Sequence, residues 1–249
     1  MPYRRLPNTN QARLRTMRVI VDKASTVADI NSLPYSLRSL EEARAMLVKY
    51  DKVVNEYQAC SNIQAKANKK YQQELKMARL YVSHFIQVVN MCVLRGEIKK
   101  EYKELYKLAP DSTMVPDLSS EDKLEEWGIN VIEGEQKRQL KGGTPIYNPS
   151  IAKVKVFFEI FVESHRSQKI LQANTNRKME EVIALNEAVD KIILDAWDEI
   201  EKTFEDLQGE EKVAKCQEYG IIYYYRRAEK RKMAQREAME AENDQMENF

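Results

Sequence analysis

The two histidines, His84 and His165, are the first residues to test for chemistry. A di-iron carboxylate site in a helical bundle needs a Glu-x-x-His pair on each of two helices, because this spacing places both ligands on one helix face. Tyr81 and Val162 stand three residues before the two histidines. The spacing therefore argues against such a site, and we predict no bound metal.

A group of polar residues near the middle of two helical segments could instead hold a small ligand in a bundle. The group consists of Gln64, Asn68, His165, Gln172 and Asn176. The alternative, which the sequence favours, is structural amides that set the helix register or lie in exposed turns. In that interpretation His165 is a buried histidine hydrogen-bonded to a neighbouring helix. It lies three residues after Val162, on the row of residues that we predict to face the core of the bundle.

Two basic clusters could contact phosphates or nucleic acid. Residues 1–23 hold six basic residues against one acidic residue, a net charge of +5, and residues 226–236 have the same balance. The candidate contacts are Arg4, Arg5, Arg13, Arg15, Arg18, Arg226, Arg227 and Arg231. Residues 195–211 carry eight acidic residues and one lysine, a net charge of −7. We therefore favour docking of the basic ends beside this acidic segment, or simple solvation, over nucleic-acid binding.

No other motif indicates catalysis. Cys60, Cys92 and Cys216 are odd in number and widely separated, so we predict reduced thiols rather than disulfides or a zinc site. The chain contains no glycine-rich phosphate loop and none of the GxSxG or HExxH motifs. We assign no catalytic residue and no cofactor, and the sequence leans towards a protein that is not an enzyme.

The elements that must position these residues are helices. Residues 35–95 and 150–208 contain none of the seven glycines and seven prolines of the chain, the residues least compatible with a helix interior. Core positions recur at spacings of 3 and 4 from Ala43 to Cys92. The sequence therefore predicts an all-α protein, an elongated antiparallel bundle of long helices.

Whether each block is one helix or a hairpin is left open by the pattern. Polar residues 61–68 and 172–176 interrupt the apolar stripe, and Asn, Ser and Thr favour caps and turns. We therefore favour a turn in each block, although the unbroken phase of the stripe favours one long helix. Adding 108 to positions of the first block gives similar residues in the second, for example Phe85 and Ile193, which makes internal duplication an option.

Shorter elements complete the predicted organisation. Thr9 precedes a helix over 11–24, Ser39 and Glu42 form a capping box for the first block, and Ser119 starts a helix that ends by residue 142. A short helix over 210–218 precedes an extended run over 221–225. We predict one domain over 1–225, with halves 35–108 and 150–208 joined by 109–149, and a charged, frayed tail over 226–249.

Three segments resemble a known family. RRLPNT (4–9), ARLYVSHFIQVVN (78–90) and GGTPIYNP (142–149) are similar to segments of a family of uncharacterised helical proteins from Bacteroidetes-type bacteria. The resemblance implies an all-helical, cytosolic bacterial protein. The family has no assigned activity, so the resemblance transfers no functional residue.

Together these features predict a non-enzymatic helical scaffold or interaction protein. Its partner is an unknown protein or a second copy of the chain. Nucleic-acid association through the arginines is one alternative, and a ligand-binding or enzymatic bundle with a central polar pocket is another. The N-terminus lacks the apolar region of a signal peptide, and the most apolar run, 80–94, is shorter than the 20 or so residues that cross a bilayer. We therefore expect a cytoplasmic protein without a membrane segment.

Overall fold

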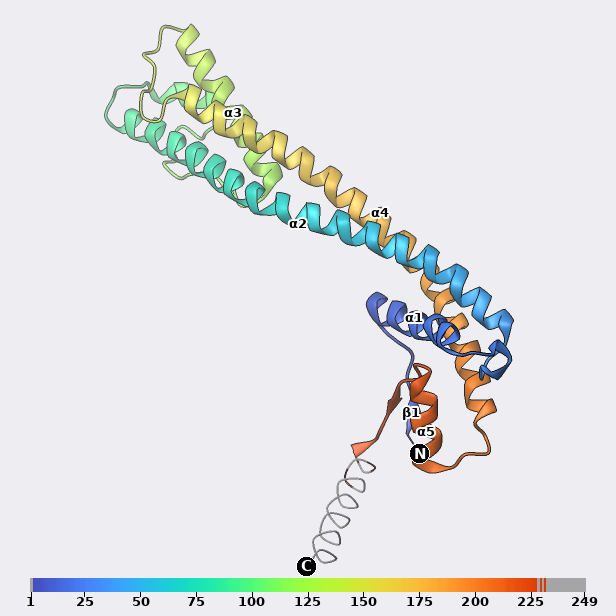
Figure 1. Ribbon diagram of the computed structural model, residues 1–249. Helices are drawn as coiled ribbons and strands as arrows, with labels where there is room; N and C mark the ends of the chain where they lie inside the picture. Colours follow the sequence, from blue (N-terminus) through green and yellow to red (C-terminus); the bar gives the residue numbers. More distant parts are fainter. Residues whose placement is uncertain (1, 228, 230, 232–249) are drawn as a thin grey trace, which may run out of the picture. The chain divides into compact units, whose positions relative to one another are not determined.

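The chain folds as an all-α helical bundle. The computed structural model describes residues 2–227, 229 and 231, and it places two very long helices with three shorter ones (Figure 1). The elements in chain order are β1 (Tyr3–Arg4), α1 (Asn10–Thr26), the 3₁₀ turn η1 (Ile30–Ser32), α2 (Leu37–Leu94), the 3₁₀ turn η2 (Lys100–Tyr106), α3 (Glu121–Leu140), α4 (Ile151–Thr203), α5 (Gly209–Glu218) and β2 (Tyr223–Tyr224). The predicted fold class is confirmed, and most of the predicted tail lies outside the described residues.

Each block without Gly and Pro forms one unbroken helix, so the expected turns are wrong. α2 has 58 residues and α4 has 53, and both pass through the polar segments at 61–68 and 172–176. Thr175 shows how a turn-prone residue is accommodated, because its hydroxyl donates to the carbonyl of Leu171, 3.0 Å away in the same helix. The continuous spacing of the core stripe therefore outweighs the local preference of Asn, Ser and Thr for turns.

The start of α2 also differs from the predicted capping box. The helix begins at Leu37, and the hydroxyl of Ser36 accepts the amide of Ser39 at 3.2 Å. Ser39 instead donates its own hydroxyl to Glu199, at 2.8 Å. A carboxylate from a distant part of the chain thus supports this helix N-terminus, where negative charge is favourable. The sequence near Ser39 contains no sign of it.

The chain divides into two compact units. A terminal unit combines 1–58 with 178–249, and a central unit comprises 59–177. Both long helices contribute one part to each unit, so the units do not coincide with the predicted halves 35–108 and 150–208. Each unit has its own core of buried apolar side chains.

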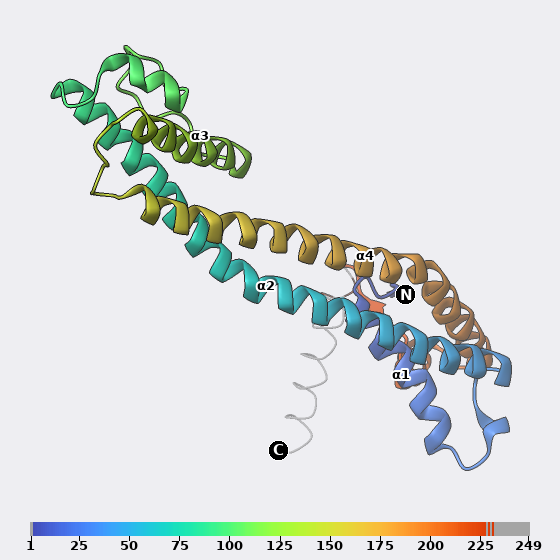
Figure 2. The same ribbon diagram turned by 90° about the horizontal axis from the view of Figure 1, so that it is seen from above.

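Within each unit α2 and α4 run antiparallel. In the terminal unit Tyr50 bonds Asn186, and Glu56 binds Lys178, which comes earlier in the sequence than Asn186. In the central unit α3 lies beside the long helices in both views (Figures 1 and 2).

The predicted internal duplication compares positions that are 108 residues apart. Phe85 and its counterpart Ile193 are both buried, whereas Tyr71 is buried and its counterpart Met179 is exposed. Internal duplication stays a prediction.

The apolar segment of α2 bears on membrane topology. Among the described residues, α2 is the one helix whose length and composition would allow it to cross a membrane. Of its most apolar 18-residue window, 39% is buried in the protein. A core helix of a soluble protein meets the same criterion, so the absence of a membrane segment stays a prediction.

A small sheet joins the two ends of the terminal unit. β2 lies inside the predicted extended run 221–225 and pairs antiparallel with β1, with Tyr3 opposite Tyr224. The amide of Arg5 continues the pairing by donating to the carbonyl of Ile222 at 3.0 Å. The sequence contained no signal for β1, because a two-residue strand has no periodicity.

α3 contains two glycines where neighbouring elements come close. A Cβ at Gly128 would lie 2.1 Å from the ring of Phe158 in α4. A Cβ at Gly134 would lie 2.8 Å from the carbonyl oxygen of Leu105 and from the Cα of Tyr106. Both glycines are therefore required for close packing of α3.

We expect Gly134→Ala to lower the free energy of unfolding by about 1–3 kcal/mol. Alanine normally favours a helix over glycine by about 1 kcal/mol, but the η2 backbone has to move to make room for the methyl group. Urea denaturation followed by circular dichroism measures the effect. Glu126→Ala, an exposed change in the same helix, is the control and should stay within about 0.5 kcal/mol. Equal or higher stability of Gly134→Ala would refute the close approach.

Candidate functional site

The candidate site lies in the central unit, around a contact between Tyr71 of α2 and His165 of α4. The Tyr71 hydroxyl lies 3.0 Å from Nδ1 of His165 and 3.3 Å from Oε1 of Glu121, at the start of α3. The His165 ring also stacks on Phe161, with centroids 5.6 Å apart. His165 therefore bonds a neighbouring helix, in agreement with that part of the interpretation, but it is half-buried rather than buried.

The partners of Tyr71 favour a proton on Nδ1 of His165. The hydroxyl has one proton, and carboxylate oxygens accept, so Tyr71 donates to Glu121 and Nδ1–H of His165 donates to Tyr71. Nε2 of His165 is buried without a hydrogen-bond partner among the described residues. Burial, reinforced by Glu121, raises the pKa of Tyr71 to about 12. The phenol therefore stays protonated at neutral pH and keeps this arrangement.

A polar cavity of about 610 Å³ opens beside this contact. Its wall consists of Ser61, Gln64, Ala65, Asn68, Tyr71, Gln72, Glu121, His165, Gln168, Lys169 and Gln172. Four of the five residues of the predicted polar cluster are thus brought together. Asn176 is exposed and does not line the cavity. The binding role of these residues stays a prediction.

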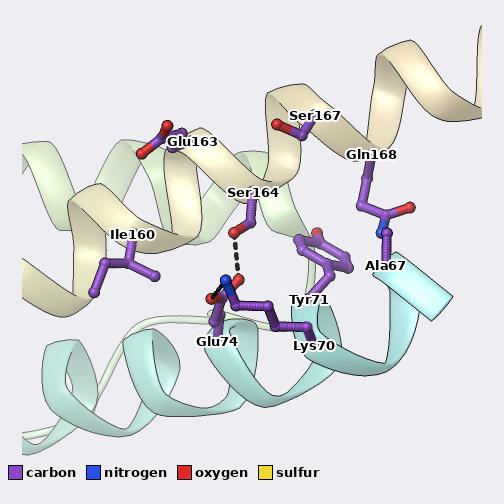
Figure 3. A pocket seen from close by; sticks show the side chains of 9 residues that line it. All are labelled: Ala67, Lys70, Tyr71, Glu74, Ile160, Glu163, Ser164, Ser167 and Gln168. Carbon is purple, nitrogen blue, oxygen red and sulfur yellow. Dashed lines mark hydrogen bonds and ion pairs between the residues drawn. The ribbon is translucent and has the colours of Figure 1, made fainter. Parts of the chain in front are cut away.

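A second cavity, of about 410 Å³, lies beside Tyr71 and Gln168, which line both (Figure 3). Ser164 of α4 points towards Glu74 of α2 and donates a hydrogen bond to it. Lys70 lies 3.4 Å from the same carboxylate. The remaining wall residues are Ala67, Ile160, Glu163 and Ser167. Sequence analysis did not identify this group, although the spacing of Lys70, Tyr71 and Glu74 on one helix could have indicated it.

The chemistry that the two cavities offer is hydrogen bonding. Their walls carry carboxamides, hydroxyls, carboxylates and lysine ammonium groups. Among the described residues, no three His, Cys, Asp or Glu side chains come together as a metal site would need. Cys92 and Cys216 are free and buried, and burial raises the pKa of both thiols. Neither is therefore a thiolate at neutral pH.

Three of the six basic residues in 1–23 bind carboxylates of their own chain, namely Arg4, Arg13 and Arg18. Arg13 forms two hydrogen bonds with Asp190, of 2.7 and 2.8 Å. Arg4 reaches both Asp198 and Glu201 in the acidic segment, at 2.5 and 3.1 Å. The expected docking beside residues 195–211 is therefore present for Arg4, whereas Asp190, the partner of Arg13, lies outside this segment.

The other candidate arginines have different surroundings. Arg18 pairs with Asp51 at 2.6 Å, and Arg5 lies over the ring of Tyr224. The remaining ones, Arg15, Arg226, Arg227 and Arg231, are exposed. Four of the N-terminal arginines that could have contacted phosphates thus have separate partners within the chain. Most of the surroundings of the second basic cluster lie outside the described residues.

A buried ionic group in the central unit was missed by sequence analysis. Arg138 donates to both carboxylate oxygens of Glu135, at 2.7 and 2.9 Å, and to the carbonyl of Thr144 at 2.6 Å. The Tyr106 hydroxyl donates to Glu135 at 2.5 Å. Glu135 and Arg138 are three residues apart in α3, a spacing that could have indicated the pair, but nothing local indicated its burial. Through Tyr106 and Thr144, these hydrogen bonds connect η2 and the 141–150 segment to α3.

Fold and site together define an all-α bundle protein with paired polar cavities between two long helices. Comparison with protein-family models, curated proteins and solved structures finds no match to this chain. The functional assignment therefore depends on the chemistry of the site.

Proposed function

We propose that the chain binds a small, hydrogen-bonding ligand in the cavity beside Tyr71 and His165. The observation that carries this proposal is the composition of the cavity wall. Two antiparallel helices normally present apolar side chains to each other along their contact. Here α2 and α4 present carboxamides and charged groups around a space of about 610 Å³. That volume is within the range of small-molecule sites. This space is open to solvent, and Asn68, Gln72, Lys169 and Gln172 on its wall are exposed.

The wall indicates the character of the ligand. Gln64, Asn68, Gln72, Gln168 and Gln172 each offer an N–H donor and a carbonyl acceptor. Lys169 and Glu121 add one charge of each sign, so the wall has no strong preference for an anion or a cation. The best-matched ligand is an uncharged or zwitterionic molecule with several hydroxyl or amide groups.

Ligand-induced thermal stabilisation tests the proposal. The melting temperature of the full chain would be measured with glucose, uridine and glutamine as separate probes. A probe present at 100 times its Kd stabilises the folded state by about 2.7 kcal/mol. In a protein of this size that corresponds to a shift of about 5–10 °C.

Two variants locate the effect. Gln64→Leu and Gln172→Leu remove amides from facing walls of the cavity, and each should weaken binding of a responding probe. Gln217→Leu, an exposed position on α5 outside the cavity wall, is the matched control. Absence of any probe-induced shift, or a shift that Gln64→Leu and Gln172→Leu leave unchanged, would contradict the proposal.

The scaffold role predicted from the sequence is the second candidate. The observation that favours it is a set of exposed apolar residues on α2, namely Leu80, Met91 and Leu94. This role does not depend on the cavity, because none of these residues lines it. Nucleic-acid association has less support, since Arg4, Arg13 and Arg18 are engaged with carboxylates.

A further inference from the structure

The C-terminal part of α2 has an outer face without formal charge. Asp, Glu, Lys and Arg make up 32% of the chain, yet none occurs between Leu80 and Leu94. The inner side of this segment, including Phe85 and Val89, is fully buried in the core of the central unit. The outer side is solvent-exposed, so depletion of charge there is not explained by packing within the chain.

The exposed residues form one continuous stripe. They are Leu80, His84, Gln87, Met91 and Leu94, at spacings of 4, 3, 4 and 3. At 3.6 residues per turn these positions lie within an arc of about 80°. Leu80, Met91 and Leu94 are 54%, 51% and 65% exposed. Apolar residues at this spacing, with charge absent between them, are typical of a helix that packs against another helix.

The two ends of the stripe are symmetric about Gln87, whereas His84 lies three residues before it and Met91 four residues after it. Leucine stands seven residues before Gln87 and seven residues after it. If a second α2 packed antiparallel with Gln87 at the centre, Leu80 of each copy would meet Leu94 of the other. The two Gln87 amides could then bond reciprocally, because each has a donor and an acceptor.

The charges beyond the stripe disfavour a parallel pair. Arg95 and Glu97, which follow Leu94 just after the helix ends, bind each other at 2.6 and 2.9 Å, so this end of the stripe has no net charge. An antiparallel pair places Lys76 of one copy, one turn before Leu80, near this neutral pair of the other, whereas a parallel pair places the two Lys76 ammonium groups together. Like charges that meet at an interface oppose association.

We propose that this stripe is the interface of a symmetric dimer, in which α2 helices of two copies pack antiparallel about Gln87. A twofold interface uses the same patch on both subunits, and the stripe is self-complementary in this way. From Leu80 to Leu94 it is about 21 Å long at 1.5 Å per residue. Such a small contact fits a reversible dimer rather than an obligate one. The proposal names the partner for the scaffold role and is independent of the cavity ligand.

Sedimentation equilibrium of the full chain tests self-association. Over about 1 to 100 µM, the range that resolves a micromolar Kd, the mean mass should rise from 29.1 kDa towards twice that value. The double change Leu80→Glu with Leu94→Glu should remain at the monomer mass. Val48→Glu, at another exposed apolar position of α2, is the control and should still dimerise. Circular dichroism verifies that all three proteins are folded.

Cysteine cross-linking tests the register. In a Cys60→Ser background, Gln87→Cys should form a disulfide-linked dimer with oxidised glutathione. Leu80→Cys alone should not, because the two copies of that position would be about 21 Å apart, beyond the reach of a disulfide. A mixture of Leu80→Cys and Leu94→Cys should form linked heterodimers.

Three results would overturn the proposal. One is a mass of 29.1 kDa at every concentration. Another is efficient linking of Leu80→Cys to itself with none in the mixture, which would indicate a parallel pair. The third is flotation of the monomer with phosphatidylcholine vesicles that is abolished by the double glutamate change, which would assign the stripe to a membrane surface.

Discussion

Glu135→Ala is expected to lower the free energy of unfolding of the central unit by about 3–5 kcal/mol, the usual loss when one partner of a buried ion pair is removed. The change leaves the Arg138 guanidinium, 3% exposed, without its carboxylate, and Tyr106 without its acceptor. The chain has two tryptophans, and Trp127 lies in α3. Urea denaturation followed by Trp127 fluorescence in a Trp197→Phe background measures the loss.

Glu133→Ala is the matched control, because it removes an exposed carboxylate that pairs with Lys137 one turn along α3. Exposed pairs of this kind contribute about 0.3–0.5 kcal/mol. A loss for Glu135→Ala as small as that of the control would show that the buried pair is not formed.

The same group predicts a pH dependence. Burial by itself disfavours the charged form of Glu135, but hydrogen bonds from Arg138, Tyr106 and Gln139 outweigh it and lower the pKa. A carboxyl group with a lowered folded-state pKa stabilises the fold above its unfolded pKa, about 4.3, and loses this contribution as pH falls through the folded value. The difference in the free energy of unfolding between the native chain and Glu135→Gln should therefore be largest at pH 7 and should decrease below about pH 4. A difference that is constant with pH would mean that the charge of Glu135 does not stabilise the fold.

Trp197→Ala is expected to destabilise the terminal unit by about 3–5 kcal/mol. Trp197 is fully buried in the core that α1 and both long helices share, and truncation leaves a large cavity among packed side chains. Urea denaturation followed by far-ultraviolet circular dichroism measures the change.

Two further variants distinguish cavity formation from loss of polarity. The indole N–H of Trp197 is buried without a partner among the described residues, so Trp197→Phe keeps most of the volume and removes this unsatisfied donor. It should cost much less than Trp197→Ala. Val48→Ala, at an exposed position, should stay within about 0.5 kcal/mol. A near-zero loss for Trp197→Ala would remove it from the core.

Part of the candidate site was predictable from the sequence. The polar cluster was visible because Gln64, Asn68 and Gln172 interrupt apolar stripes that are otherwise regular. The contacts of Tyr71 with His165 and with Glu121 were not visible, since the three residues come from three helices and their meeting depends on how those helices align. For the same reason the ion pairs of Arg4 and Arg13, separated from their partners by more than 170 residues, were only an expectation about net charge.

The sequence by itself determined the local structure of this protein. Absence of Gly and Pro over 35–95 and 150–208, with core positions at spacings of 3 and 4, specified helices, and Thr9 specified the start of α1. These features act between residues a few positions apart, so their effect can be read along the chain.

Other features depend on tertiary contacts, and the local conformational preferences of the residues do not predict them. The tertiary structure placed Glu199 at the start of α2 and required Gly134 for the approach of η2. Local preferences differ by at most about 1 kcal/mol per residue for most residue types, whereas burying a large apolar side chain contributes about 1.5–3 kcal/mol. Contacts between distant segments therefore outweigh local conformational preferences. Which residues of two helices face each other is known only from the packed structure.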